Sequence, residues 1–227
     1  MKYTERLLKN ETFLKIMGQV RVLENDRIYC HHELEHALDV ARIAWIYYLE
    51  DESRERLSGD FGSCPGEAAE SPAKGKEYVE RKDLIYAAAL LHDIGRAAQY
   101  ETGVHHSIAG LQIAAGILEE IGFPEKEAQA VLAVVAEHPL SAGAASVQKA
   151  ELVSDERTQE AERKNEVTEA AGKRSRNPES SQNEKNREDL LLIYITRADH
   201  DCRLCFFCEA KETCKWSKEE RNQTVLS

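Results

Sequence analysis

Six histidine and aspartate residues are placed where they could bind metal ions together. They lie far apart in the chain, but each falls at or beside a position that helical spacing assigns to a core: His36, His92, Asp93, His106, His138 and Asp199. His36 shares a predicted helix face with Val40 and Tyr47, and Asp199 shares one with Ile195. Five predicted helices therefore each direct a histidine or an aspartate inward, and Asp93 directly follows His92.

Converging imidazole and carboxylate groups need a shared partner, because burying one of them alone costs on the order of several kcal/mol. Helical bundles meet this need with metal ions held by side chains from facing helices. A mixed set of this kind suits Mn, Fe, Co, Ni or Zn, whereas carboxylates alone would favour Mg. Six ligands exceed what one ion with open coordination positions requires. The sequence therefore predicts one or two divalent ions, and two if Asp93 bridges them.

Three of these positions, His36, His106 and Asp199, have a competitor close by in the chain. The competing residues are His31, His32, His105, His200 and Asp201. The apolar spacing favours the six residues named above, yet His32 lies one turn before His36 on nearly the same side and could bind substrate. His138 could instead act only as a cation at the C-terminal end of its helix, where the helix dipole favours positive charge.

Apolar residues at helical spacing predict helices along most of the chain, with no alternating pattern typical of strands. The predicted ranges are residues 3–24, 33–50, 81–95, 105–121, 124–138 and 188–201, with a short final helix from residue 217. Two stretches rich in polar and charged residues, 51–78 and 141–188, predict long disordered or mobile insertions. We therefore expect an all-α domain over residues 1–201 and a cysteine-containing tail, 202–227, that packs on it.

The order and context of the candidate ligands resemble the HD-domain superfamily of metal-dependent phosphohydrolases. The family's H…HD…D pattern is similar to the segments HHELEHALDVARIA, LLHDIGR and RADHD. Its metal ligands then fall on His36, His92, Asp93 and Asp199. His106 and His138 resemble the two extra histidines of the two-metal branch. The resemblance covers the helical parts of 26–140 and 187–201, and it implies an HD-domain helical bundle.

The resemblance also implies a reaction. A bound metal would lower the pKa of its water from about 15.7 toward 7 and neutralise phosphoryl charge, and Asp93 would bridge the ions and orient the nucleophile. Arg96 stands where many relatives have lysine, and it could clamp a phosphate oxygen. We expect a phosphohydrolase that acts on a small-molecule phosphoester or phosphoanhydride, with a nucleotide as one candidate. Two alternatives stay open: a non-enzymatic metal-binding regulatory module and a di-iron oxygenase of the same fold.

Cysteines near the C-terminus suggest a second metal site. Four of them follow the spacing C-x2-C-x2-C-x5-C, which could hold zinc or an iron–sulfur cluster but matches neither common ferredoxin pattern. Cys30 lies six residues before His36, and Cys202 lies three after Asp199. If His36 and Asp199 bind the same metal ion, Cys30 lies near the C-terminal cysteines. It could then replace Cys202 as the fourth ligand of the structural metal. The predicted structural site is then Cys30, Cys205, Cys208 and Cys214; the alternative is a set of reduced thiols.

Composition limits the partners. The chain has 227 residues and a net charge of −11, which argues against a nucleic-acid backbone or an anionic membrane as the main partner. Its first residues lack the apolar segment of a secretory signal, and no run approaches the ~20 apolar residues that span a bilayer. We expect a cytoplasmic protein with a small-molecule phosphate substrate, and a homo-oligomer is compatible with the sequence.

Overall fold

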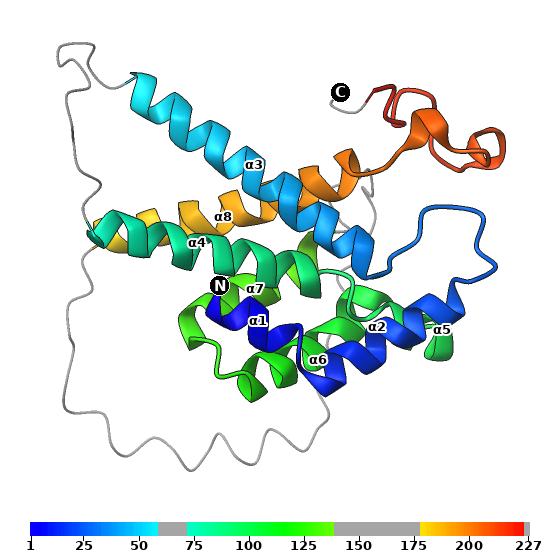
Figure 1. Cartoon of the computed structure of the whole chain (residues 1–227), viewed down its shortest axis with the longest axis horizontal. Coiled ribbons are helices and arrows are strands. Elements are labelled where there is room, and N and C mark those ends of the chain that lie inside the picture. Colours follow the sequence, from blue (N-terminus) through cyan, green and yellow to red (C-terminus); the bar gives the residue numbers. More distant parts are fainter. Residues whose placement is uncertain (59–71, 139–177, 225–227) are drawn as a thin grey trace, which may run out of the picture.

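Three long helices lie together in the upper part of the molecule as Figure 1 shows it: α3 (Leu34–Ser58), α4 (Pro72–Leu91) and α8 (Pro178–Asp201). The structure is a computed structural model, and it describes residues 1–58, 72–138 and 178–224. Helix α3 packs against both α4 and α8. Small buried residues line these contacts and allow close approach; they are Ala41, Ala44, Ala87, Ala88 and Ala198.

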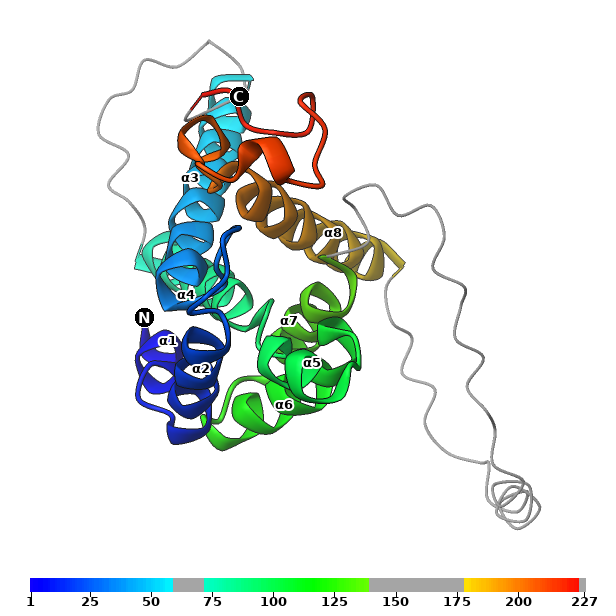
Figure 2. The ribbon, with the colours of Figure 1, turned by 90° about the vertical axis from the view of Figure 1, so that its right-hand side faces the viewer.

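A second group of helices packs beneath this layer (Figures 1 and 2). It contains α1 (Lys2–Leu7), α2 (Glu11–Leu23), α5 (Arg96–Thr102), α6 (His106–Glu120) and α7 (Glu125–Glu137). Helix α7 contacts α4 and α8 and so joins the two groups, while α1 packs on α4 and α2 on α5. The part of the chain that the structure describes contains helices and no strand, which confirms the predicted all-α class.

The N-terminal region forms two helices where the sequence predicts one over 3–24. Asn10 causes the break, because its side-chain oxygen accepts a hydrogen bond from the Phe13 backbone N–H at 2.8 Å and caps α2. The buried carboxylate of Asp83 on α4 accepts bonds from the backbone N–H groups of Tyr3 and Thr4 at 2.8 and 2.7 Å. A negative charge at the start of α1 therefore fixes this short helix to the core.

The two predicted insertions are narrower than expected. Helix α3 continues through residues 51–58, α4 already begins at Pro72, and α8 begins at Pro178, so both ends of 51–78 and the end of 141–188 are helical. The remaining parts, 59–71 and 139–177, lie outside the described residues. These helix ends could not be recognised from composition, because they extend past the core and therefore need no apolar face. Once a helix has formed, each further residue adds a hydrogen bond at little cost.

The tail after α8 contains two short 3-10 turns, η3 (Cys205–Phe207) and η4 (Lys211–Thr213). The predicted final helix from Ser217 is wrong: residues 217–224 form turns and bends. There the Glu220 carboxylate accepts the Ser217 backbone N–H at 2.7 Å. The Asn222 side chain donates to the carbonyl oxygens of His200 and Arg203, at 2.8 and 2.9 Å, and so holds the tail against the end of α8.

Candidate metal centre

The six predicted ligands meet between the two groups of helices. His36 comes from the first turn of α3, His92 and Asp93 from the turn after α4, His106 from the first position of α6, His138 from the residue after α7, and Asp199 from the last turn of α8. His92, Asp93, His106 and His138 are buried, and His36 and Asp199 are nearly so, with side chains 11% and 18% exposed. The fold therefore brings together residues as far apart in sequence as 36 and 199.

The Asp93 carboxylate lies at the middle of this cluster. Its Oδ1 is 3.3 Å from His106 Nε2 and 3.4 Å from His138 Nε2, and its Oδ2 is 3.3 Å from His92 Nε2. On the other side, His36 Nε2 is 3.2 Å from Asp199 Oδ1. Two sets of three ligand atoms lie within 4.8 Å of one another and share Asp93: one with His36 and His92, the other with His106 and His138. The cluster can thus hold metal on both sides of Asp93.

The histidine rings are fixed by the nitrogen that faces away from the centre. His92 Nδ1 donates to the Ala89 carbonyl at 2.6 Å, and His138 Nδ1 donates to the Val134 carbonyl at 3.0 Å. His106 Nδ1 lies 3.0 Å from the Gln99 side-chain oxygen. An imidazole that donates through Nδ1 keeps a lone pair on Nε2, which is the usual arrangement around a protein-bound metal. All three Nε2 atoms therefore face the Asp93 carboxylate, where a metal ion could bind them.

Three buried polar atoms at the centre lack a hydrogen bond: His36 Nε2, His92 Nε2 and Asp199 Oδ1. Each would cost ~1–3 kcal/mol if it stayed unsatisfied. The other nitrogen of His36, Nδ1, lies 3.4 Å from the Cys202 sulfur, which in turn donates to the Asp199 carbonyl at 3.2 Å. A shared cation would satisfy all three atoms at once, and the donor set of imidazole and carboxylate fits a divalent transition metal.

Electrostatics at the centre favour charged aspartates but act differently on two of the histidines. Burial alone would lower the pKa of His92, but the Asp93 carboxylate raises it, whereas the pKa of His106 is lowered. Although burial opposes the effect, the charges of His92 and Arg96 hold the pKa of Asp93 well below its usual value. Burial lowers the pKa of His106 to about 3. His106 is therefore unprotonated near neutral pH, and its Nε2 is available as a ligand without first losing a proton.

Gly95 allows the turn that carries Asp93 to approach α6. An added Cβ would stand 2.0 Å from the His106 carbonyl oxygen and 2.6 Å from the Gly110 backbone nitrogen. The backbone of Gly95 has φ −81°, which any residue adopts, so contact rather than conformation requires glycine here. The two backbones touch at this point, and the contact sets how far His106 stands from Asp93.

His32 connects the centre to a buried carboxylate that sequence analysis missed. Its Nδ1 donates to Glu24 Oε1 at 2.7 Å, and its Nε2 lies 3.9 Å from Asp93 Oδ2. Glu24 is fully buried and also accepts from the His32 backbone N–H and from the Tyr100 hydroxyl, each at 2.6 Å. The sequence contained one signal for Glu24: as the C-cap residue of α2, it follows the buried residues Met17 and Val20 at helical spacing.

Two arginines lie against the aspartates. Arg96 Nε donates to Asp93 Oδ1 at 2.8 Å, and Arg203 donates to Asp199 Oδ2 at 2.7 Å. Arg96 was predicted to contact phosphate, and it lies beside the centre. Arg203 was missed, because it follows the predicted helix 188–201 in a segment without apolar periodicity. Each arginine reduces the repulsion between the two carboxylates.

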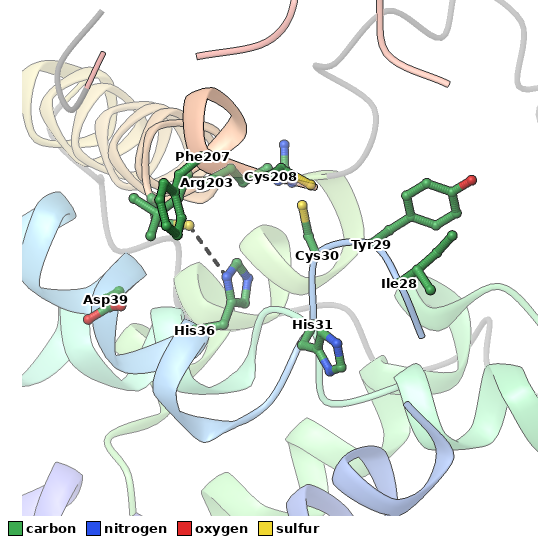
Figure 3. A pocket seen from close by; sticks show the side chains of 11 residues that line it. Ile28, Tyr29, Cys30, His31, His36, Asp39, Arg203, Phe207 and Cys208 are labelled. Atoms are coloured by element: carbon green, nitrogen blue, oxygen red, sulfur yellow. Dashed lines mark hydrogen bonds between the residues drawn. The ribbon is translucent and has the colours of Figure 1, made fainter. Parts of the chain in front are cut away.

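A cavity of about 410 Å³ opens beside His36 (Figure 3). Its polar wall includes His31, His36 and Arg203 together with one carboxylate, Asp39, and its other walls include Cys30 and Phe207. Basic side chains therefore face a space next to the cluster, where an anionic molecule could bind.

Comparison with protein families explains this arrangement. The model of the HD domain matches residues 34–204, about three quarters of the chain. The chain belongs to the HD-domain family. This confirms the family and the HD-type helical bundle predicted from H…HD…D. HD domains bind divalent metals, and the His/Asp groups around Asp93 are able to hold them.

Three relatives have similar sequences. An uncharacterized protein of Clostridium beijerinckii is 25% identical over 95% of this chain and 93% of its own length. An uncharacterized protein of Methanocaldococcus jannaschii is 38% identical over 35% of this chain and 40% of its own length. A bifunctional uridylyltransferase/uridylyl-removing enzyme of Bradyrhizobium diazoefficiens is 25% identical over 56% of this chain, which spans only 12% of that enzyme. No solved structure matches the chain.

No helix within the described ranges is both long enough and apolar enough to cross a membrane.

Proposed function

We propose that this chain is a metal-dependent phosphohydrolase that cleaves a phosphoester or phosphoanhydride bond in a small molecule. The observation that carries the proposal is the buried cluster around Asp93, in which His36 Nε2, His92 Nε2 and Asp199 Oδ1 face a common point without hydrogen bonds. Family membership supports a hydrolytic role for this cluster. The fold alone would leave the reaction open.

Two metal positions are proposed, one on each side of Asp93. The first has His36, His92, Asp93 and Asp199 as ligands, and the second has Asp93, His106 and His138. Bound divalent ions would supply water of lowered pKa and would neutralise charge on the phosphoryl oxygens. The protein's part is to hold the ligand atoms in place, through the Nδ1 contacts of the histidines and through Arg96 and Arg203 on the aspartates.

His32 and Glu24 are proposed to transfer the proton. Burial lowers the pKa of His32, and the hydrogen bond to Glu24 offsets only part of that effect. Glu24 keeps the proton on Nδ1, so Nε2 faces Asp93 with a free lone pair. This nitrogen can take a proton from the attacking water and return it to the leaving oxygen. In this proposal His32 is the general base and general acid of the reaction and is not a further metal ligand.

The cavity beside His36 is proposed as the substrate site. Arg203 and His31 give it a basic wall, which suits a phosphate group in a chain whose net charge is −11. Arg96, on the other side of Asp93, can bind a second phosphoryl oxygen. A nucleotide ester is the first substrate class to test, since the Bradyrhizobium relative is named a uridylyl-removing enzyme.

Phosphate release from a panel of nucleotides and sugar phosphates, with protein loaded with Mn, Fe, Co, Ni, Zn or Mg, tests the proposal. At least one pair of metal and substrate should give turnover that His106→Ala abolishes or reduces by at least about 100-fold. His105→Asn is the matched control: His105 is the exposed neighbour that caps α6, and asparagine can also cap a helix. This control should keep full activity.

Two results would contradict the proposal. Full metal occupancy without release from any member of the panel would favour a metal-binding regulatory module. Oxygen uptake by the iron-loaded protein, without phosphate release, would favour a di-iron oxygenase.

A further inference from the structure

We propose that four cysteines outside the buried cluster bind one structural zinc ion, and that this ion ties the C-terminal tail to the segment before α3. The four ligands are Cys30, Cys205, Cys208 and Cys214. All four lie outside residues 34–204, the range that the family model matches: Cys30 precedes this range and the other three follow it. The site is independent of the proposed phosphohydrolase activity, because none of its ligands belongs to the cluster around Asp93.

The tail lacks a core of its own. Its two 3-10 turns contain no buried residue, and Leu204 and Phe207 are 59% and 82% exposed. Within residues 203–224 only Asn222 is buried. A segment with so little buried apolar surface gains too little free energy to fix its conformation, and natural proteins hold such segments with disulfides or metal ions. The described cysteines form no disulfide, and a metal ion is the other cross-link that four cysteine side chains can form.

Contacts between two distant segments bring Cys30 and the cysteines of the tail into the same region of the molecule. The Tyr29 hydroxyl donates to the Thr213 carbonyl at 3.0 Å, and these residues directly precede Cys30 and Cys214. Cys30 and Cys208 line the same cavity, and Figure 3 shows both side chains directed into the space between their segments. The charges of Cys205 and Cys208 add to burial in raising the pKa of Cys30. The hydrogen bond, the shared cavity and the electrostatic effect on the pKa each place at least one tail cysteine near Cys30, and together they include all three.

The ligand set favours zinc. Four thiolates in tetrahedral order, with two of them spaced C-x2-C, form a closed structural site. The turn between Cys205 and Cys208 is already in place, since the Cys208 backbone N–H donates to the Cys205 carbonyl at 3.3 Å. Zinc deprotonates its coordinating thiols, which overcomes the raised pKa of the Cys30 thiol.

Zinc would also draw the sulfur atoms closer together. A Zn–S distance of about 2.3 Å places tetrahedral sulfurs ~3.8 Å apart. Among the residues that the structure describes, every set of three candidate ligand atoms within 4.8 Å of one another includes His36 or Asp93, and none includes two of these four cysteines. The tail should therefore tighten against the 28–33 segment on binding. That segment carries His32 and leads directly into the helix of His36, so zinc would steady one wall of the cavity.

Elemental analysis of the full chain tests the site after the buried cluster has been disabled. In the double variant His92→Ala and Asp93→Ala, purified without an affinity tag, we expect about one zinc per chain. Adding Cys205→Ser and Cys208→Ser should remove it. Cys64→Ser, which changes a cysteine outside the described residues, is the matched control and should keep it. Cobalt substitution should give thiolate-to-cobalt charge-transfer absorption that the cysteine variants lose.

A second measurement covers the case in which the cysteine variants fail to fold. The double variant with its cysteines intact is alkylated before and after treatment with a chelator, and the labelled peptides are identified by mass spectrometry. Cys205, Cys208 and Cys214 should be protected until the chelator removes the metal. Absence of zinc, retention of zinc after loss of the cysteines, equal labelling before and after chelation, or iron with labile sulfide would each overturn the proposal.

Discussion

Replacing Gly95 with alanine should damage the metal centre through the backbone of α6. The new methyl group would stand 2.0 Å from the His106 carbonyl oxygen, and real Cβ contacts do not fall below 3.0 Å. The oxygen must therefore retreat by 3.0 − 2.0 = 1.0 Å or more. The neighbouring atoms are backbone rather than the ends of flexible side chains, so the start of α6 must move as a whole. Metal–ligand distances tolerate only about 0.2 Å.

The expected cost is about 3 kcal/mol of unfolding free energy, the upper end for overpacking, together with loss of metal from the group that contains His106. Gly116→Ala is the control on the same helix. Nothing lies within 4 Å of its added Cβ, and alanine in a helix interior should gain up to ~1 kcal/mol. Urea unfolding and metal content per chain measure both effects. If Gly95→Ala changed stability by less than about 0.5 kcal/mol and kept all of its metal, the close contact would not set the position of His106.

Three further changes test other parts of the account. His32 and Tyr100 lower the pKa of Glu24 to about 2 against the effect of burial, so the charged carboxylate stabilises the fold above about pH 4.5 by up to ~3 kcal/mol, and this contribution is lost as the pH falls toward 2. Glu24→Gln should therefore lose less stability than the parent in urea unfolding between about pH 6 and pH 3, and an equal loss would count against the buried pair. Manganese at 100 times its dissociation constant should raise the unfolding free energy of the parent by about 2.7 kcal/mol; Asp93→Ala should show little of this gain, and an unchanged gain would place the metal elsewhere. Cys202→Ser should weaken metal binding by roughly 10-fold or more, because His36 Nδ1 loses the sulfur that orients it; titration with metal measures this, and unchanged affinity would remove Cys202 from that role.

The candidate ligands could be predicted because, apart from Asp93, each of them also obeys the spacing of a buried helix face. His36 follows the face of Val40, and Asp199 follows that of Ile195; both apolar residues are fully buried. Burial was therefore predictable from the local pattern. Convergence in space required the further argument that buried imidazoles and carboxylates need a partner.

Other features depend on contacts that no local pattern encodes. Gly95 is plausible from the sequence as a helix terminator, but the structure shows that it stands against the start of α6, more than ten residues further along the chain. Glu24 follows an apolar face, and a charged residue there is usually read as a helix end at the surface. Its burial depends on His32 and Tyr100, and Tyr100 lies 76 residues away.

The outer parts of the molecule were predicted least well, for a related reason. The continuation of α3 through residues 51–58 and the start of α4 at Pro72 extend beyond the core, so no apolar stripe marks them. Hydrogen bonds and ion pairs between neighbouring turns support such helix ends; Arg54 lies 3.1 Å from Asp51, for example. The tail shows the opposite case, in which Ser217 and Glu220 resemble a helix start but form only a turn.

The most direct test of the account is a crystal structure of the manganese-loaded protein with anomalous scattering recorded. The account predicts anomalous peaks on both sides of Asp93, at roughly 2.0–2.3 Å from the ligand atoms. The first peak should contact His36, His92 and Asp199, and the second His106 and His138. Ordered protein at saturating manganese with no peak between these side chains would contradict it.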